Sequence, residues 1–381
     1  MSRWAWAEID LGAIEDNIAV LRDLVAPSEV WAVVKADAYG HGAVPVARVA
    51  ARAGATGLCV ALAQEGVELR DAGIDAPILV LSAQPEEEAR LLVQHHLAAT
   101  VHSFAHVDAL VAAGAQDHPV HLKVDTGMRR VGCEPDDAPA VADHIAAAAP
   151  HVRLAGVFTH LPIADEPDES FTAEQVRRFD AVLAALAAAG HRPDVVHLAN
   201  SAGALAHPVV RRSAVRIGIA MYGISPGPGV DHLVTGLRPA LSLRARISHV
   251  KRVRAGERVS YGLRHTFDHD SWVATLPIGY ADGVPRRLSS VGGQVLIGGH
   301  RHLIVGVVTM DQLMVELGPA VEGVAAPAAV GDPVVLLGRQ GSESITAVEW
   351  ADRLGTIGYE IVCGISRRIE RRVHDRGPVG W

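Results

Sequence analysis

The sequence contains few cysteines, which limits the classes of protein to which it can belong. Cys59, Cys133 and Cys363 are odd in number, widely spaced and form no CxxC pair. This usage is typical of reduced thiols in a cytosolic protein and argues against a disulfide framework or a zinc–thiolate site. The 20 histidines, including the HH and HRH runs, form no HExxH motif or histidine–carboxylate ligand set. We therefore expect no catalytic metal.

Long apolar runs and clusters of positive charge are also absent. No apolar stretch reaches the roughly 20 residues of a membrane span. The N-terminal MSRWAWAEIDLGAIEDN has acids where a signal peptide has its apolar core. The net charge is −8 with scattered basic residues, which argues against a nucleic-acid partner. We expect a soluble, cytoplasmic protein with neither membrane nor nucleic acid as partner.

A repeating pattern occupies the chain from Val30 to about Gly218. Short β-rich runs alternate with longer Ala/Glu/Arg-rich segments of helical period, as in EQVRRFDAVLAALAAAG. Eight units of this kind predict a (β/α)8 TIM-like barrel, with a doubly wound open sheet as the alternative. The predicted strands are VWAVVK, GLCVAL, PILVLS, AATVHS, VHLKVD, VRLAGVFTH, VVHLAN and SAVRIGI.

The pattern changes after the Gly/Pro-rich segment Pro226–Gly229, which we interpret as a linker. Short β-rich runs then follow one another without intervening helices, apart from the helix-like TAVEWADRLGT at Thr346–Thr356. This part predicts a mostly antiparallel β domain. We therefore expect an α/β protein with a barrel domain at residues 1–237 and a C-terminal β domain at 238–381. The arginine-rich RRIERRV near the end predicts a solvated strand edge or a dimer rim.

Polar residues stand at the ends of five predicted barrel strands. In such a barrel, catalytic groups come from the C-terminal ends of the strands and the loops after them. Any one of these residues is more readily structural than functional, but together they would share one rim. They are Lys35, Asp125, Thr159, His160, Asn200, Ser201, Arg216 and Gly218.

Lys35 follows an apolar strand, and this setting has a chemical consequence. A partly desolvated lysine loses proton affinity and becomes a nucleophilic amine suited to Schiff-base chemistry. Backbone N–H groups near Gly218 and Ile219, with the hydroxyls of Ser201 and Tyr39, could hold a phosphate. A lysine beside a phosphate site indicates pyridoxal phosphate. Aldolases of the same fold also use a Schiff-base lysine, so the residues alone leave that alternative open.

The segment AVVKADAYGHG resembles the cofactor-attachment segment of the bacterial alanine racemase family. The resemblance continues, in the family's order and over nearly the whole chain, through further segments. These are KVDTGMRRVG, FTHLPIADEPD, HLANSAGAL, VRIGIAMYG, VSYG, LPIGYADG, TMDQLMVEL and GYEIVCGISRRI. The resemblance implies a pyridoxal-5′-phosphate-dependent isomerase that interconverts L- and D-alanine, through an external aldimine, for peptidoglycan synthesis.

The resemblance also implies two opposed bases and a shared site. Lys35 would bind the cofactor covalently and act as one base. Tyr261 would be the second base, supplied by the partner subunit of a head-to-tail homodimer. A tyrosine with a reference pKa of about 10 needs positive charge nearby to act as a base, and His160 and Arg216 are the candidates. Arg216 would face the pyridine nitrogen and, because a guanidinium only donates hydrogen bonds, would keep that nitrogen unprotonated.

Further residues match the family's cofactor and substrate contacts. Arg130 would contact the substrate carboxylate, although Arg129 stands beside it. Lys123 matches a lysine that is carbamylated in many relatives, and Ile217 stands where proline is common. The resemblance assigns the remaining cofactor contacts to Tyr39, Asn200, Ser201, Gly218, Ile219 and Tyr359, and the remaining substrate contacts to Met310, Asp311 and Tyr280.

Two alternatives to an alanine-specific enzyme remain. A racemase of broader range, acting on serine or larger amino acids, would need a wider entrance, against which Tyr280, Met310 and Tyr359 argue. A non-catalytic pyridoxal-phosphate-binding protein built on the barrel alone would lack the β domain and Tyr261. Decarboxylases of similar architecture carry a glutamate where SAVRIGI has Arg216.

Overall fold

The chain folds into two compact units. The computed structural model describes residues 3–167 and 170–375. Residues 14–38 and 42–238 form one unit, here called the barrel unit. Residues up to 13, residues 39–41 and residues from 239 onward form the other, here called the sheet unit.

Eight parallel strands form the barrel unit, in the order β8-β7-β6-β5-β4-β3-β2-β9. The two end strands meet where the Arg216 N–H donates to the Ala199 carbonyl at 3.0 Å. The barrel is therefore nearly closed, and each of the eight predicted runs overlaps one strand. The strands are β2 Glu29–Val33, β3 Gly57–Val60, β4 Ile78–Val80, β5 Ala98–Val101, β6 His118–Lys123, β7 Val152–Phe158, β8 Val195–His197 and β9 Ala214–Ile217.

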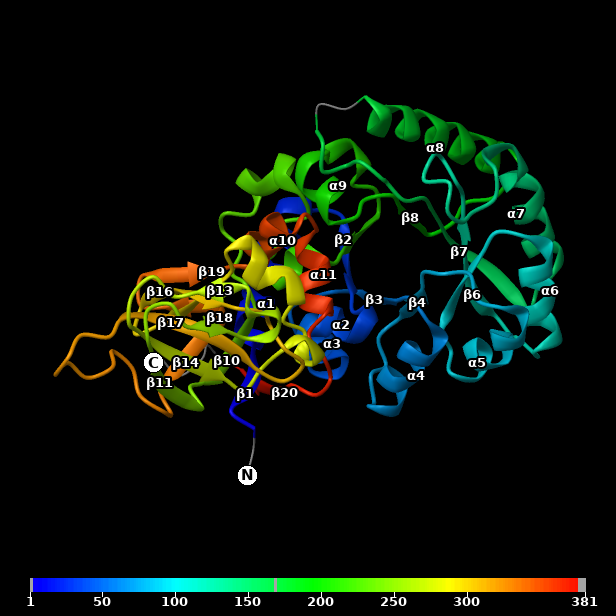
Figure 1. Cartoon of the computed structure of the whole chain (residues 1–381). Coiled ribbons are helices and arrows are strands. Elements are labelled where there is room, and N and C mark those ends of the chain that lie inside the picture. The colour runs from blue at the N-terminus through cyan, green and yellow to red at the C-terminus, as the bar shows by residue number, and fades with distance from the viewer. Residues whose placement is uncertain (1–2, 168–169, 376–381) are drawn as a thin grey trace. The chain divides into compact units, whose positions relative to one another are not determined.

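Helices follow the strands, and α6, α7 and α8 lie outside β6 and β7 (Figure 1). Their inward faces are apolar: α3, for example, buries Val46, Ala47 and Ala50, the i, i+1, i+4 spacing of one helix face. The predicted barrel with outer helices is confirmed. The helices are α1 Leu11–Val25, α2 Lys35–Gly40, α3 Ala43–Arg52, α4 Ala63–Asp71, α5 Ala89–Gln94, α6 Phe104–Ala112, α7 Ala138–Ala147, α8 Phe171–Ala188 and α9 Ser201–Ala206.

The barrel interior holds imidazoles among its apolar side chains. His121 on β6 and His197 on β8 are 2% and 1% exposed. The ring of His197 stacks on Phe158, with centroids 4.7 Å apart. A Cβ at position 156 of β7 would lie 2.6 Å from Cε1 of His121, far inside van der Waals contact. Only glycine at this position leaves room for the imidazole.

The sheet unit is mostly antiparallel, as predicted. Its large sheet has the order β11-β14-β17-β16-β15-β18-β10-β1-β20, with β19 paired to β18, and β1 with β20 is its one parallel pair among the described strands. Val253, Phe267, Val273 and Val305 form a buried cluster. The elements are β1 Ala5–Asp10, β10 Leu241–Arg246, β11 His249–Val253, β14 Ser271–Leu276, β15 Gln294–Ile297, β16 His300–Val305, β17 Leu313–Pro319, β18 Pro333–Gln340, β19 Glu343–Ile345, β20 Glu370–His374, the ribbon β12 Arg258–Val259 with β13 His265–Thr266, and the helices α10 Ala347–Leu354 and α11 Gly358–Cys363.

The predicted barrel span of residues 1–237 differs from this grouping at its start. Strand β1 pairs with β10 and β20 and so belongs to the sheet unit, as do residues 39–41. The sequence did not predict this strand, because AWAEID carries Glu8 and Asp10 within six residues. The structure removes the difficulty: the buried Glu8 carboxylate forms an ion pair with Arg244 of the neighbouring strand at 2.7 Å, which offsets much of its desolvation.

Candidate active site

The polar residues predicted at the strand ends do lie at one end of the barrel. Lys35 follows β2, Asp125 follows β6, His160 follows β7 and Ser201 follows β8. Arg216 lies within β9, the hydrogen-bonded neighbour of β2. Because all eight strands are parallel, their C-terminal ends form a single rim.

The backbone immediately after Lys35 is left-handed. Ala36, Asp37, Ala38 and Tyr39 have φ of 53°, 53°, 52° and 54°, a conformation that costs an L-residue about 1–2 kcal/mol each. Hydrogen bonds hold the turn: the Ala36 N–H donates to Glu65 Oε1 at 2.6 Å, and the Ala43 N–H donates to Asp37 Oδ1 at 2.7 Å. Strained backbone of this kind is concentrated at functional sites.

Arg216 lies deep in the barrel, with 3% of its surface exposed. Its guanidinium donates to the carbonyl oxygens of Thr159, His197 and Leu198 at 2.9–3.0 Å, and it lies 5.3 Å from the centroid of the Phe158 ring. Burial lowers the pKa of Arg216 to about 10, so the group stays charged at neutral pH.

Two histidines extend the contacts of Arg216. Its NH1 donates to Nδ1 of His197 at 2.7 Å. Since the guanidinium has no acceptor, Nδ1 of neutral His197 carries no proton and Nε2 does. That Nε2–H then donates to Nδ1 of His121 at 2.9 Å. Burial first, and then the charge of Arg216, holds the pKa of His197 well below its usual range and lowers that of His121 to about 3.

Positive charge is concentrated at this end of the barrel. Burial, followed by the charges of Arg216 and Arg130, lowers the pKa of Lys123 to about 7. Burial, and then the charges of Arg216, Lys123, Arg130 and Lys35, holds the pKa of His160 well below its usual range. Four cationic groups therefore act on one neutral imidazole. Such a site is electrostatically suited to an anionic ligand.

The structure distinguishes the two arginines of the Arg129/Arg130 doublet. Arg129 has positive φ of 56° and binds Glu134 through both carboxylate oxygens, at 2.8 and 3.0 Å. Arg130 is the one whose charge lowers the pKa values of Lys123 and His160. Asp125, whose Oδ1 accepts the N–H groups of Gly127 and Arg129, opposes this positive charge only in part, since the pKa of Lys123 remains lowered.

Backbone N–H groups converge on the Ser201 hydroxyl. Those of Gly218 and Ala220 approach its Oγ at 2.9 and 3.4 Å. A hydroxyl oxygen that accepts two bonds still has its own proton to donate, so the Ser201 hydroxyl can bind a phosphate oxygen. Asn200 caps α9: its Oδ1 accepts the Gly203 N–H at 2.9 Å and its Nδ2 donates to the Leu161 carbonyl at 3.1 Å.

The other predicted site residues belong to the sheet unit. Tyr261 is 74% exposed, on a turn in which Ser260 and Leu263 have positive φ. Tyr280 and Met310 are 42% and 53% exposed. Asp311 forms an ion pair with Arg368 at 2.7 Å. The rings of Tyr39 and Tyr359 have centroids 6.0 Å apart, and the Gly40 carbonyl accepts a bond from Arg371 at 3.2 Å.

Three residues that support this site, Glu65, His121 and His197, were not predicted from the sequence. Glu65 accepts the Ala36 N–H through one carboxylate oxygen and the N–H groups of Ala61 and Leu62 through the other. A Glu shortly after the end of a strand, at the third position of a helix, is a recognisable signal for such a cap. His121 and His197 could have been recognised as polar residues inside otherwise apolar strands.

Two other kinds of site have no counterpart in the described part of the chain. Within residues 3–167 and 170–375, none of the helices combines the length and apolar character needed to cross a bilayer. Over the same residues, no group of three or more His, Cys, Asp or Glu side chains is arranged to hold a metal ion.

Comparison with known proteins gives a consistent result over both units. Residues 9–226 match the family model for the alanine racemase N-terminal domain, and residues 240–373 match that for its C-terminal domain. An alanine racemase of Symbiobacterium thermophilum is 48% identical over 97% of each chain. One of Geobacillus stearothermophilus is 43% identical over 97% of this chain and 93% of its own.

Solved structures agree with these sequence matches. The crystal structure of alanine racemase from Bacillus anthracis with bound L-Ala-P has a TM-score of 0.91 and 40% identity, covering 98% of this chain and 96% of its own. That of alanine racemase from D-cycloserine-producing Streptomyces lavendulae has a TM-score of 0.90 and 38% identity, covering 100% and 98%.

Proposed function

Because the chain belongs to the alanine racemase family, we propose that it interconverts L-alanine and D-alanine with pyridoxal 5′-phosphate as cofactor. The observation that carries the proposal is the placement of Lys35 at the end of β2, beside the neighbouring strand β9 that holds the buried, charged Arg216. A phosphate and an amino-acid carboxylate would bring negative charge to this positively charged end of the barrel.

The residues of the barrel unit fit this cofactor. The Ser201 hydroxyl, whose oxygen accepts the N–H groups of Gly218 and Ala220, would donate its proton to the phosphate. Gly218, Ile219 and Asn200, with Tyr39 and Tyr359 of the sheet unit, would complete the cofactor contacts. Arg216 would donate to the pyridine nitrogen, and its fixed charge would keep that nitrogen from taking a proton. Lys35 would bind the cofactor covalently. When bound, the cofactor supplies the electron-withdrawing system that acidifies the α-carbon of the substrate.

Racemisation needs a base on each face of the α-carbon, one to remove the proton and one to return it. We assign these roles to the amine of Lys35 and to the phenol of Tyr261 of the partner subunit. The exposure of Tyr261, at 74%, is compatible with a contribution to another chain. Of the two candidates named for the positive charge that a phenolate needs, His160 is excluded, because burial and neighbouring charges hold its pKa well below its usual range and leave it neutral. Arg216 would supply that charge.

The substrate carboxylate would be bound by Arg130. Lys123, with its pKa lowered to about 7, has a large neutral fraction at neutral pH and is therefore suited to carbamylation, which would turn a cation beside Arg130 into an anion that pairs with it. Met310, Asp311 and Tyr280 would line the substrate side. The proposal includes a head-to-tail homodimer, a cytoplasmic location and a role in supplying D-alanine for peptidoglycan.

The decisive experiment incubates purified protein and pyridoxal phosphate with L-alanine and measures D-alanine enantiospecifically. L-serine and L-lysine are tested in parallel, and the Lys35→Ala variant is the matched control. We expect D-alanine from the parent protein and almost none from the variant. Faster turnover of serine or lysine than of alanine would favour a broader-range racemase, and cofactor binding without any turnover would favour a carrier protein.

A further inference from the structure

The RRIERRV segment, predicted as a solvated strand edge or a dimer rim, also contains an arginine that pairs with two acids. Arg367 is exposed, as expected for a solvated residue. Arg368, although 47% of its side chain is exposed, forms ion pairs with two acids, Asp311 at 2.7 Å and Asp282 at 3.5 Å. Both acids are in the sheet unit, and each belongs to a turn that carries candidate substrate residues.

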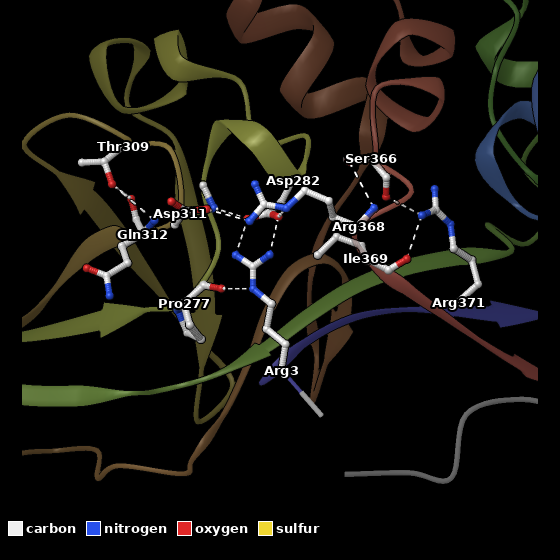
Figure 2. Close-up of polar contacts among 11 residues, drawn as sticks. Arg3, Pro277, Asp282, Thr309, Asp311, Gln312, Ser366, Arg368, Ile369 and Arg371 are labelled. Atoms are coloured by element: carbon white, nitrogen blue, oxygen red, sulfur yellow. Dashed lines mark hydrogen bonds and ion pairs between the residues drawn. The ribbon is translucent and has the colours of Figure 1, made fainter. Parts of the chain in front are cut away.

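Asp282 is the buried centre of these contacts, with 0% of its surface exposed. Arg3 binds both of its carboxylate oxygens, at 2.5 and 2.6 Å, and also donates to the Pro277 carbonyl at 3.0 Å. The Gly279 N–H donates to Asp282 Oδ2 at 2.9 Å. Figure 2 shows Arg3 and Arg368 approaching this one carboxylate. Paired charges of this kind fix geometry strongly, because a buried carboxylate left unpaired is costly.

The two turns are also joined through their backbones. The Tyr280 N–H donates to the Thr309 carbonyl at 2.9 Å, and the Ala281 N–H donates to the Met310 carbonyl at 3.0 Å. A Cβ on Gly279 would collide with both of these carbonyl oxygens, so the approach is possible only with glycine. Arg368 spans the pair of turns from the outside, with Asp282 in one and Asp311 in the other.

The side chains on these turns depend on the backbone for their position. Tyr280 and Met310 are 42% and 53% exposed within the described chain, so packing in the sheet unit alone does not fix them. The ion pairs of Arg368 restrict the two turns that carry them. Loosening these turns would widen the space beside the substrate's side chain.

We propose that Arg368 is a positioning residue that, through Asp282 and Asp311, fixes the Tyr280 turn and the Met310–Asp311 turn and thereby restricts the site to amino acids with small side chains. The inference rests on the proposed function, which assigns Tyr280, Met310 and Asp311 to the substrate side. Arg368 itself need not touch the substrate.

The test compares Arg368→Met with the matched control Arg367→Met in the full-length, cofactor-loaded protein. The first readout is the ratio of kcat/KM for alanine to kcat/KM for serine. We expect this ratio to fall about two- to five-fold in Arg368→Met, the range that the loss of a half-exposed ion pair allows, with most of the change in KM. Arg367→Met should leave it unchanged. Arg368→Lys should restore it in part, because an ammonium can pair with one acid but cannot bridge both as a planar guanidinium does.

The second readout, amide hydrogen exchange of the free protein, does not depend on activity. Peptides covering residues 279–283 and 309–312 should exchange about two- to five-fold faster in Arg368→Met than in Arg367→Met. Equal exchange in the two variants would overturn the positioning role, even if the parent protein proved to have no racemase activity. Faster exchange with an unchanged alanine-to-serine ratio would overturn the link to substrate choice.

Discussion

Arg216 determines the tautomer of His197: the guanidinium donates to Nδ1 of the imidazole at 2.7 Å, and this bond requires a neutral ring with its proton on Nε2. Burial, and then the charge of Arg216, holds the pKa of His197 well below its usual range.

His197→Leu should lower the free energy of unfolding by about 2 kcal/mol more than His197→Asn does, because a buried hydrogen bond to a charged group contributes about 1.5–3 kcal/mol. Leu and Asn have nearly the same shape, so both variants lose the stacking on Phe158 equally. Only Asn retains an acceptor for Arg216. Denaturant midpoints at fixed protein concentration measure the difference, and equal losses would show that the bond contributes nothing.

Lys123→Met should stabilise the cofactor-free protein at pH 6 by an amount on the order of 3 kcal/mol. The pKa of Lys123 is lowered to about 7, whereas in the unfolded chain it is about 10.4. The folded protein therefore binds fewer protons than the unfolded chain between these values, and the parent's stability rises with pH across this interval. The free-energy cost of burying the charged Lys123 amine is therefore fully present below pH 7 and disappears above about pH 10.

The measurement for Lys123 is urea unfolding in CO2-free buffer at pH 6 and pH 9.5, at one protein concentration. The advantage of Lys123→Met over the parent should shrink at the higher pH. An advantage that does not change with pH would mean that Lys123 is not buried as a charged amine below pH 7.

Borohydride reduction of the cofactor-loaded protein should fix the label on the peptide that contains Lys35. The chain has three lysines, Lys35, Lys123 and Lys251, so peptide mapping by mass spectrometry gives an unambiguous answer. Lys35 follows a barrel strand at the rim, where the substrate would have access to a covalently bound cofactor. Label on Lys123 or Lys251 would refute the assignment.

Mixing Lys35→Ala and Tyr261→Ala chains should restore activity that neither variant has alone. If each site uses Lys35 of one chain and Tyr261 of the other, a heterodimer has one site with both lesions and one with neither. Random exchange makes about half of the dimers heterodimers, so roughly a quarter of all sites would be intact, as expected for a two-fold symmetric dimer.

The recovered activity should depend on protein concentration as dimers dissociate. Mass-tagged chains verify that exchange has occurred. If activity does not return after verified exchange, both bases come from the same chain and the shared site is wrong.

The barrel strands could be predicted because they lie in short, largely apolar runs, although β6 and β8 also carry His121 and His197. Prediction failed where pairing between residues distant in sequence decides the structure. Strand β1 was missed because Glu8 argued against burial, and its partner Arg244 is more than 200 residues away. Arg368 was interpreted as a solvated charge for the same reason, since Asp282 and Asp311 are distant in sequence.

The local geometry of the site was less predictable than its residues. The resemblance of AVVKADAYGHG to a known segment indicated Lys35 and Tyr39, but nothing in Ala36, Asp37 or Ala38 indicates positive φ. The network from Arg216 through His197 to His121 likewise has no motif, because its members come from three strands. Tertiary contacts determine both features.

The left-handed turn after Lys35 has a consequence for any mutational scan of this protein. Glycine and asparagine adopt positive φ more easily than other residues. Glycine at positions 36 and 38, and asparagine at the exposed position 36 but not at the fully buried position 38, should therefore be enriched whenever selection acts on folding, even where they contribute nothing to chemistry. Tolerance of such substitutions at these two positions would reflect the left-handed main-chain conformation. It should be separated from the chemical requirement for Lys35 before the scan is used to map the reaction.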